Sequence, residues 1–97
     1  MMNKIIFSID AVNDLEKIKI YIEEELNNHL SGIEIVKKII KSINNLVDFP
    51  ELGKSLSSIV NFQTNYRYLI CNNYYIFYYV ENNHIFIVKI ILFLLSS

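Results

Sequence analysis

The 97-residue sequence has little of what marks several classes of protein. It contains two glycines, one proline and one cysteine, and no tryptophan. So few glycines and prolines exclude a linker or a fibrous repeat, and a hydrophobic content of 53% excludes intrinsic disorder. The lone Cys71 cannot form an internal disulfide, so the fold does not depend on an oxidising compartment. We expect the whole range 1–97 to form one domain with a single core.

The net charge and the length of the apolar runs argue against nucleic-acid-binding, membrane-spanning and secreted proteins. The formal net charge is −1, whereas proteins that bind nucleic-acid phosphates usually carry a clear basic excess. The longest apolar stretch, Ile85 to Leu95, is interrupted by Lys89 and is shorter than the roughly 20 residues that span a bilayer. The amino-terminal segment also lacks the apolar run and cleavage site of a signal peptide. These features predict a cytoplasmic protein without a membrane partner.

The first part of the chain predicts a strand and then a helix. Lys4–Ile9 is short and rich in residues that favour strands. Asp10 supplies an acceptor for a helix start, and Asp14 adds negative charge to the first turn. The next apolar residues have the spacing of one helix face, and Asn27-Asn28 ends the pattern. This stripe consists of Ala11, Leu15, Ile18, Ile22 and Leu26.

A second helix is predicted to follow. Ser31 and Glu34 have the spacing of a capping box, with Leu30 and Ile35 placed for a hydrophobic staple. Pro50 limits this helix, because a residue that precedes proline is disfavoured in the α region. The residues expected to be buried are Val36, Ile39, Ile40, Ile43 and either Leu46 or Val47.

The second half of the chain predicts three strands after a polar connection at Glu51–Thr64, which has a short extended piece at Ile59–Phe62. Asparagines at Asn72-Asn73 and in Glu81-Asn82-Asn83 suit the left-handed conformations of hairpin turns. The expected strands are Asn65–Cys71, Tyr74–Val80 and His84 to about Leu94. The order β-α-α-β-β-β predicts an α+β fold, a helical hairpin packed on a mostly antiparallel sheet.

The last two strands are apolar on both faces, which is unusual for a sheet with one solvated side. In the last strand, Phe86, Val88, Ile90 and Leu92 alternate with Ile85, Ile87, Ile91 and Phe93. Two helices cover one face only, so we expect another polypeptide to cover the second face or a groove beside it. For the tyrosines alone, a solvated face is equally consistent with the sequence, whereas Ile85, Ile87, Ile91 and Phe93 together are expected to form a face that a partner covers.

Residues suited to catalysis or metal binding are few. His29, His84 and Cys71 have no recognisable ligand spacing, so no metal or cofactor is expected. Cys71 is interpreted as a small buried residue. Two interpretations stay open for Arg67, the only arginine. Either its stem covers apolar surface while its head reaches water, or its guanidinium grips a carboxylate or phosphate of a partner.

Several phrases of the sequence, taken in order, resemble the RelE/ParE family of toxins from bacterial type II toxin–antitoxin systems. The resemblance covers about residues 3 to 92. The phrases are Ala11-Val12-Asn13-Asp14-Leu15 with Ile18 and Tyr21-Ile22, Val36-Lys37-Lys38-Ile39, Leu46 with Phe49-Pro50-Glu51-Leu52-Gly53, Tyr66-Arg67-Tyr68-Leu69, Asn73 to Val80, and Ile87-Val88-Lys89-Ile90.

The resemblance implies a growth-inhibiting toxin, of a kind tied to plasmid stabilisation, that is neutralised by a cognate antitoxin. Such an antitoxin wraps an extended and helical segment around the helices and the sheet, which combines strand addition with a helix in a groove. The implied assembly is a toxin–antitoxin hetero-oligomer or a homo-oligomer. The partner-binding candidates are Leu15, Ile18, Ile22, Tyr66, Arg67, Tyr75, Phe77, Tyr79, Ile91 and Phe93.

The toxic activity that the resemblance implies depends on the branch of the family. RelE-like members cut mRNA in the ribosome with basic residues and a tyrosine or histidine near the carboxyl end. Here Tyr75 occupies the position of an arginine in the middle strand, and Phe93-Leu94-Leu95-Ser96-Ser97 replaces the basic tail. ParE-like members act on DNA gyrase by binding, which is the activity we predict.

Two alternatives stay open. One is a ribosome-dependent mRNA endoribonuclease that uses Arg67, Lys89 and Tyr75 as catalytic residues. The other is an attenuated toxin that binds only its antitoxin, its apolar ending recording a frameshift or truncation.

Overall fold

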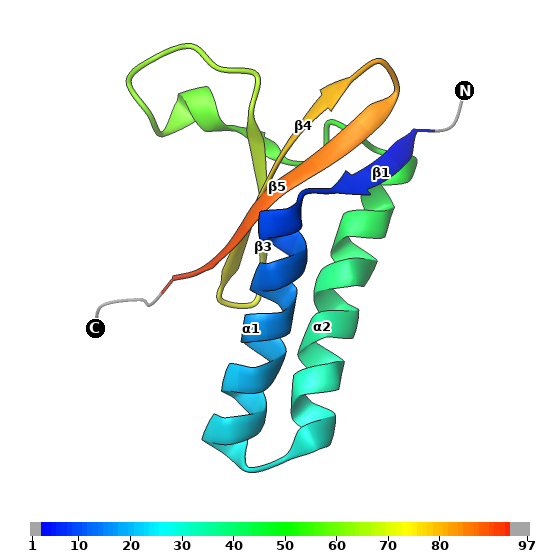
Figure 1. Cartoon of the computed structure of the whole chain (residues 1–97). Coiled ribbons are helices and arrows are strands. Elements are labelled where there is room, and N and C mark those ends of the chain that lie inside the picture. Colours follow the sequence, from blue (N-terminus) through cyan, green and yellow to red (C-terminus); the bar gives the residue numbers. More distant parts are fainter. Residues whose placement is uncertain (1–2, 94–97) are drawn as a thin grey trace.

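The computed structural model describes residues 3–93 and confirms the predicted α+β fold. A helical hairpin packs on a mostly antiparallel sheet, which has one short strand more than expected (Figure 1). The elements are β1 (Lys4–Phe7), α1 (Ile9–Leu26), α2 (His29–Asn44), the 3-10 helix η1 (Asn45–Val47), β2 (Lys54–Ser55), the 3-10 helix η2 (Leu56–Ser58), β3 (Arg67–Cys71), β4 (Tyr74–Glu81) and β5 (His84–Leu92).

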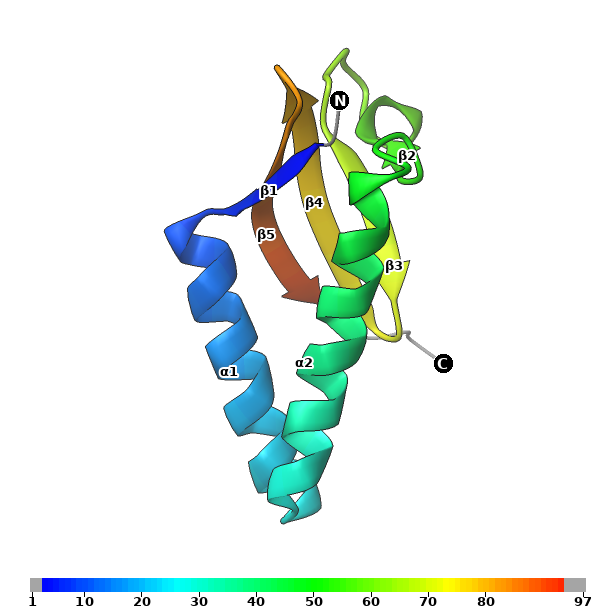
Figure 2. The same ribbon diagram turned by 90° about the vertical axis from the view of Figure 1, so that its right-hand side faces the viewer.

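The sheet has five strands in the order β1-β5-β4-β3-β2. Strand β1 pairs with β5 in parallel, and the other neighbours are antiparallel. Figure 2 shows both helices on the same face of this sheet, with the tip of the helical hairpin extending past the strands. The opposite face therefore has no helical layer from the described part of the chain.

Helix α1 begins earlier than the sequence indicated. The predicted strand Lys4–Ile9 ends at Phe7, and Ser8 rather than Asp10 is the N-cap, because its hydroxyl oxygen accepts a hydrogen bond from the Ala11 N–H. The same hydroxyl donates to the Val88 carbonyl at 2.8 Å, a tertiary contact that fixes Ser8 in the capping position. The predicted end is confirmed, since Asn27 is left-handed with φ 49°.

Helix α2 also begins earlier, so the predicted capping box of Ser31 and Glu34 is wrong. Asn28 is the N-cap, and its side chain accepts from the Leu30 N–H at 3.0 Å. A side chain at Gly32 would place its Cβ 2.6 Å from the Lys19 carbonyl oxygen. The two helices therefore approach closely at Gly32, where a larger side chain would clash with the backbone of α1.

The connection and the strand bounds differ in detail from the prediction. The extended piece lies at Lys54–Ser55, not at Ile59–Phe62, because it pairs with Tyr68 and Arg67 of β3. Strand β3 begins at Arg67 instead of Asn65, β4 runs one residue further, to Glu81, and β5 ends at Leu92. Leu94, the expected end of the last strand, lies outside the described residues. Both predicted turns have left-handed asparagines, Asn72, Asn82 and Asn83.

The core lies between the helices and one sheet face. A bulge shifts the pairing of β4 with β5, so that Phe77 pairs with Lys89 and Tyr78 with Ile87. Because of this shift Ile85 and Ile87 are fully buried in the core, while Ile91 is exposed, which corrects the predicted grouping of these residues on one uncovered face. Ile40, predicted to be buried, is also exposed. The largest fully buried side chains are Tyr78, Ile39, Ile43, Leu46, Ile76, Ile85 and Ile87.

Candidate functional site

The sheet face opposite the helices carries a continuous set of aromatic rings, which we call the aromatic face. Tyr79 is central to one group, with its ring 5.3 Å from Tyr66 in an edge contact and 4.8 Å from Phe86 in a stack. Tyr75 is central to the other group, 4.4 Å from Phe93 and 5.8 Å from Phe77. The aromatic face comprises Tyr66, Tyr68, Tyr75, Phe77, Tyr79, Phe86 and Phe93.

The rings of the aromatic face cover one another instead of being covered by a helix. Tyr68 is buried and contacts Tyr75 and Phe77, whereas most of the other rings are half-buried. The aliphatic neighbour Ile70 is 55% exposed. Contiguous apolar surface of this kind is a usual mark of a contact site for another protein.

The predicted partner-binding residues fall into three places. Six of them lie on or next to the aromatic face: Tyr66, Tyr75, Phe77, Tyr79, Ile91 and Phe93. Leu15, Ile18 and Ile22 of α1 pack against the core of the chain itself. Arg67 lies on the helix-covered face, because its direct partner across the strands is the core residue Tyr78.

The charge of Arg67 is engaged within the chain. Its Nη1 donates to the carbonyl oxygen of Gly53 at 2.7 Å and to that of Glu51 at 3.5 Å. The guanidinium therefore stabilises the loop after η1 by bonding to its backbone. The structure thus gives Arg67 a third role, which neither interpretation of the sequence included: it is an internal clamp on this loop.

Tyr78 holds the same loop from within the core. Its hydroxyl donates to the Pro50 carbonyl at 2.9 Å and accepts from the Gly53 N–H at 2.8 Å, and the side chain is fully buried. Burial raises the pKa of Tyr78, against the opposing effects of the Gly53 N–H and the Arg67 charge. A Cβ at Gly53 would lie 2.5 Å from the hydroxyl, which explains the glycine here. The bonds of Tyr78 to this loop were not predicted from the sequence, although the Phe49–Gly53 phrase was part of the family resemblance.

Lys89 is paired with a buried acid at the edge of the sheet. Its Nζ donates to Asp14 Oδ1 at 2.9 Å, and this bond raises the pKa of Lys89. The other carboxylate oxygen of Asp14 accepts from the Ile90 N–H at 2.9 Å, beyond the point where β1 stops pairing with β5. Asp14, 7% exposed, thus closes the β5 edge, a role that its position in the sequence did not indicate.

The three nuclease candidates do not form a common site. Arg67 lies on the helix-covered face with Tyr78, whereas Tyr75, three residues before Tyr78 on β4, lies on the aromatic face. Lys89 is bound to Asp14. Across residues 3–93, no three His, Cys, Asp or Glu side chains are grouped to hold a metal ion. In the same range no helix has the length and apolar character needed to cross a membrane.

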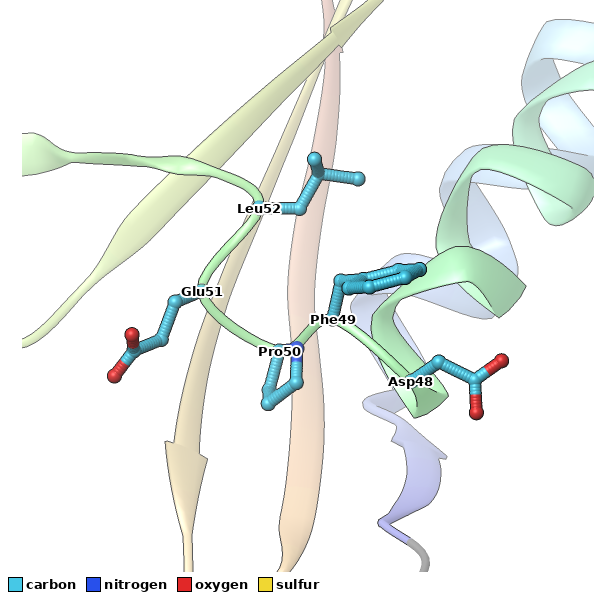
Figure 3. A pocket seen from close by; sticks show the side chains of 5 residues that line it. All are labelled: Asp48, Phe49, Pro50, Glu51 and Leu52. Atoms are coloured by element: carbon cyan, nitrogen blue, oxygen red, sulfur yellow. The ribbon is translucent and has the colours of Figure 1, made fainter.

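A shallow open hollow lies at the loop that Arg67 and Tyr78 hold. It is lined by Asp48, Phe49, Pro50, Glu51 and Leu52 (Figure 3). Phe49 is 65% exposed and Leu52 53% exposed, so this loop presents apolar side chains to solvent. A second hollow, lined by Leu52, Lys54, Tyr68, Leu69 and Ile70, lies at the β2 end of the sheet.

Comparisons with known proteins agree with the fold and with the resemblance read from the sequence. The model of a family described as the ParE toxin of the type II toxin–antitoxin system parDE matches residues 5–91. A search of curated proteins found no match. A solved structure titled "Chromosomal ParDE TA system from P. aeruginosa" superposes with a TM-score of 0.77 at 19% identity, covering 94% of this chain and 96% of that one.

Proposed function

The chain belongs to the ParE family of toxins of type II toxin–antitoxin systems, and on that basis we propose that a cognate antitoxin covers its aromatic face and that it acts by binding a protein target. DNA gyrase is the target that the resemblance implies. We do not propose the mRNA cleavage that RelE-like members carry out.

The observation that carries the protein-binding mode is the separation of the candidate catalytic residues. Cleavage at a ribose 2′-hydroxyl needs a proton-transfer group and a cation close to the same reacting atoms. Here Arg67 donates to loop carbonyls on one face of the sheet, while Tyr75 stacks with Phe77 and contacts the tilted ring of Phe93 on the other. Lys89 is neutralised by Asp14. This distribution supports a toxin whose work is recognition.

Two features support the antitoxin contact. The aromatic face is apolar and lacks a helical layer, and the edge of β3 is only partly paired, since β2 reaches Arg67 and Tyr68 alone. Within the described residues, no backbone bond reaches Leu69–Cys71 from that side. An extended antitoxin segment pairs with this free edge, beside the exposed Ile70, and a helix packs on the rings.

The target is tested with the purified full-length chain in two assays. We expect inhibition of gyrase-catalysed supercoiling and no codon-specific cleavage when mRNA ends are mapped in translating ribosomes. Codon-specific cleavage that disappears in Arg67→Lys, in which an ammonium replaces the guanidinium that binds both loop carbonyls through Nη1, would refute the protein-binding mode.

The antitoxin contact is tested by co-expression with the small reading frame adjacent to the gene, followed by calorimetric titration of the purified pair. Tyr79→Lys places a charge in the middle of the aromatic face, and we expect it to weaken binding at least about tenfold. Lys38→Ser changes an exposed residue on α2, away from the aromatic face, and is the control that we expect to leave the affinity unchanged. Equal affinities for both variants would place the antitoxin elsewhere.

A further inference from the structure

The loop at residues 48–52 has a fixed shape, although it lies between regular elements. Its backbone is closed by bonds from the Phe49 N–H to the Asn45 carbonyl and from the Leu52 N–H to the Phe49 carbonyl, both at 3.0 Å. The Tyr78 hydroxyl binds the Pro50 carbonyl, and the Arg67 guanidinium binds the Glu51 carbonyl. Side chains on this loop are therefore presented in one arrangement, which lowers the entropy lost when a partner binds.

The side chains that the loop presents are apolar and exposed. Figure 3 shows the Phe49 ring and the Leu52 side chain on the same side of the loop. The core does not include either residue, so neither the packing of the helices nor that of the sheet accounts for them. Exposed apolar surface of this kind on a pre-formed loop is a common mark of a contact site for another protein.

The charge around the hollow favours a cation. Its five lining residues include two acids, Asp48 and Glu51, and no base, and the Arg67 guanidinium that reaches this loop is already bound to the Gly53 and Glu51 carbonyl oxygens. Asp48 follows the end of η1, where the backbone carbonyls of a helix terminus add negative potential. In Figure 3 Asp48 lies beside the Phe49 ring, whereas the Glu51 carboxylate points away from it. The ring face and the Asp48 carboxylate together suit a guanidinium or ammonium group.

We propose that the 48–52 hollow is a second docking site, separate from the aromatic face, for a polypeptide segment that carries an arginine or lysine next to a large aliphatic side chain. The cation lies over the Phe49 ring next to Asp48, and the aliphatic side chain packs between Phe49 and Leu52. The clamp of Arg67 and Tyr78 acts by positioning these groups. The site does not depend on the identity of the toxin target.

The probe is an acetylated peptide of sequence Gly-Arg-Leu-Leu-Arg-Gly, compared with the same peptide in which glutamate replaces arginine. Each is titrated into the ¹⁵N-labelled full-length chain and followed by amide chemical shifts. We expect saturable shifts at residues 48–52 with the arginine peptide, weakened by salt, and none with the glutamate peptide. Shifts that are absent, or equal for both peptides, would overturn the proposal.

Variants separate the contributing groups without disturbing the core, since all are exposed side chains. We expect Phe49→Ser and Asp48→Asn each to raise the dissociation constant of the arginine peptide by about two- to fivefold. Glu51→Gln is the matched control, and we expect a change below about twofold because its carboxylate points away from the ring. An equal effect of the two acids would reject the assignment of the cation to Asp48. Shifts at 48–52 that grow with protein concentration and resist the peptide would assign the hollow to a second copy instead.

Discussion

The two faces of the sheet are built from similar residues but do different work. On the helix-covered face, Ile76, Tyr78, Ile85 and Ile87 are fully buried beneath α1 and α2. On the aromatic face, rings of comparable size cover one another and stay half-exposed. Apolar content alone therefore does not identify a core, because a second layer decides which face stabilises the fold and which is left for a partner.

Adjacent tyrosines of β4 show the contrast most directly. Tyr78 is fully buried, and its hydroxyl makes two hydrogen bonds to the backbone of the 50–53 loop. Tyr79, the next residue, points to the other side, where its ring lies between Tyr66 and Phe86. One tyrosine is therefore structural and the other is available for recognition, as the alternation of a strand requires.

The largest difference between the faces should appear on truncation of their isoleucines. We expect Ile87→Ala to lower the free energy of unfolding by about 2–5 kcal/mol, because it opens a cavity in a fully buried part of the core. Ile91→Ala, on the aromatic face and 42% exposed, should cost less than about 1 kcal/mol. Urea unfolding followed by circular dichroism measures both, and equal costs would remove the distinction between the faces.

A smaller effect is expected at Gly53, where the covered face meets its loop. Alanine at this position would place a methyl group 2.5 Å from the Tyr78 hydroxyl and 2.9 Å from the Tyr68 carbonyl oxygen. We expect Gly53→Ala to lower the free energy of unfolding by about 1–3 kcal/mol. In a Tyr78→Phe background part of the clash is gone, so the two changes should be less than additive in the same unfolding assay. Full additivity would mean that Tyr78 does not hold Gly53.

The edge of β5 offers a test of similar or smaller size. In Asp14→Leu the Ile90 N–H and the Lys89 ammonium both lose their acceptor, and we expect a loss of about 1–3 kcal/mol in the free energy of unfolding. Lys89→Met leaves the buried carboxylate without its cation but still bonded to the Ile90 N–H, so we expect it to lower stability while keeping that bond. Hydrogen exchange of the Ile90 amide distinguishes the two, since only Asp14→Leu should expose it.

Hydrophobic periodicity predicted the two helices, and runs of strand-forming residues between asparagine turns predicted the main strands, which was sufficient for the fold class. Helix starts were not predictable in the same way. Ser8 caps α1 because its hydroxyl also reaches Val88, and that contact joins residues far apart in the sequence. The bulge beside Val88 had no local signal either, so the faces of β5 were misassigned at Ile85 and Ile87.

For the residues of the candidate sites too, contacts between distant parts of the chain could not be predicted from the sequence. The apolar strands pointed to a face without cover, and its rings could be read from the alternation of β4. Arg67 was singled out as the only arginine, but its acceptors are backbone carbonyls of a loop, which the sequence does not place. Asp14 looked like an ordinary residue of a first turn, although it binds Ile90 across the fold.

The smallest predicted effect is the contribution of Tyr78, on the covered face, to stability at alkaline pH. Burial raises the pKa of Tyr78 above the ordinary value of 10.0, so the unfolded chain releases this proton at a lower pH than the folded chain. The stability linked to the neutral phenol is therefore fully present below pH 10.0 and is lost as the pH rises through the folded pKa. We expect the free energy of unfolding, measured in urea between about pH 9 and pH 11, to fall less steeply in Tyr78→Phe than in the wild type. A slope in Tyr78→Phe as steep as that of the wild type would show that burial does not hold this phenol in its neutral form.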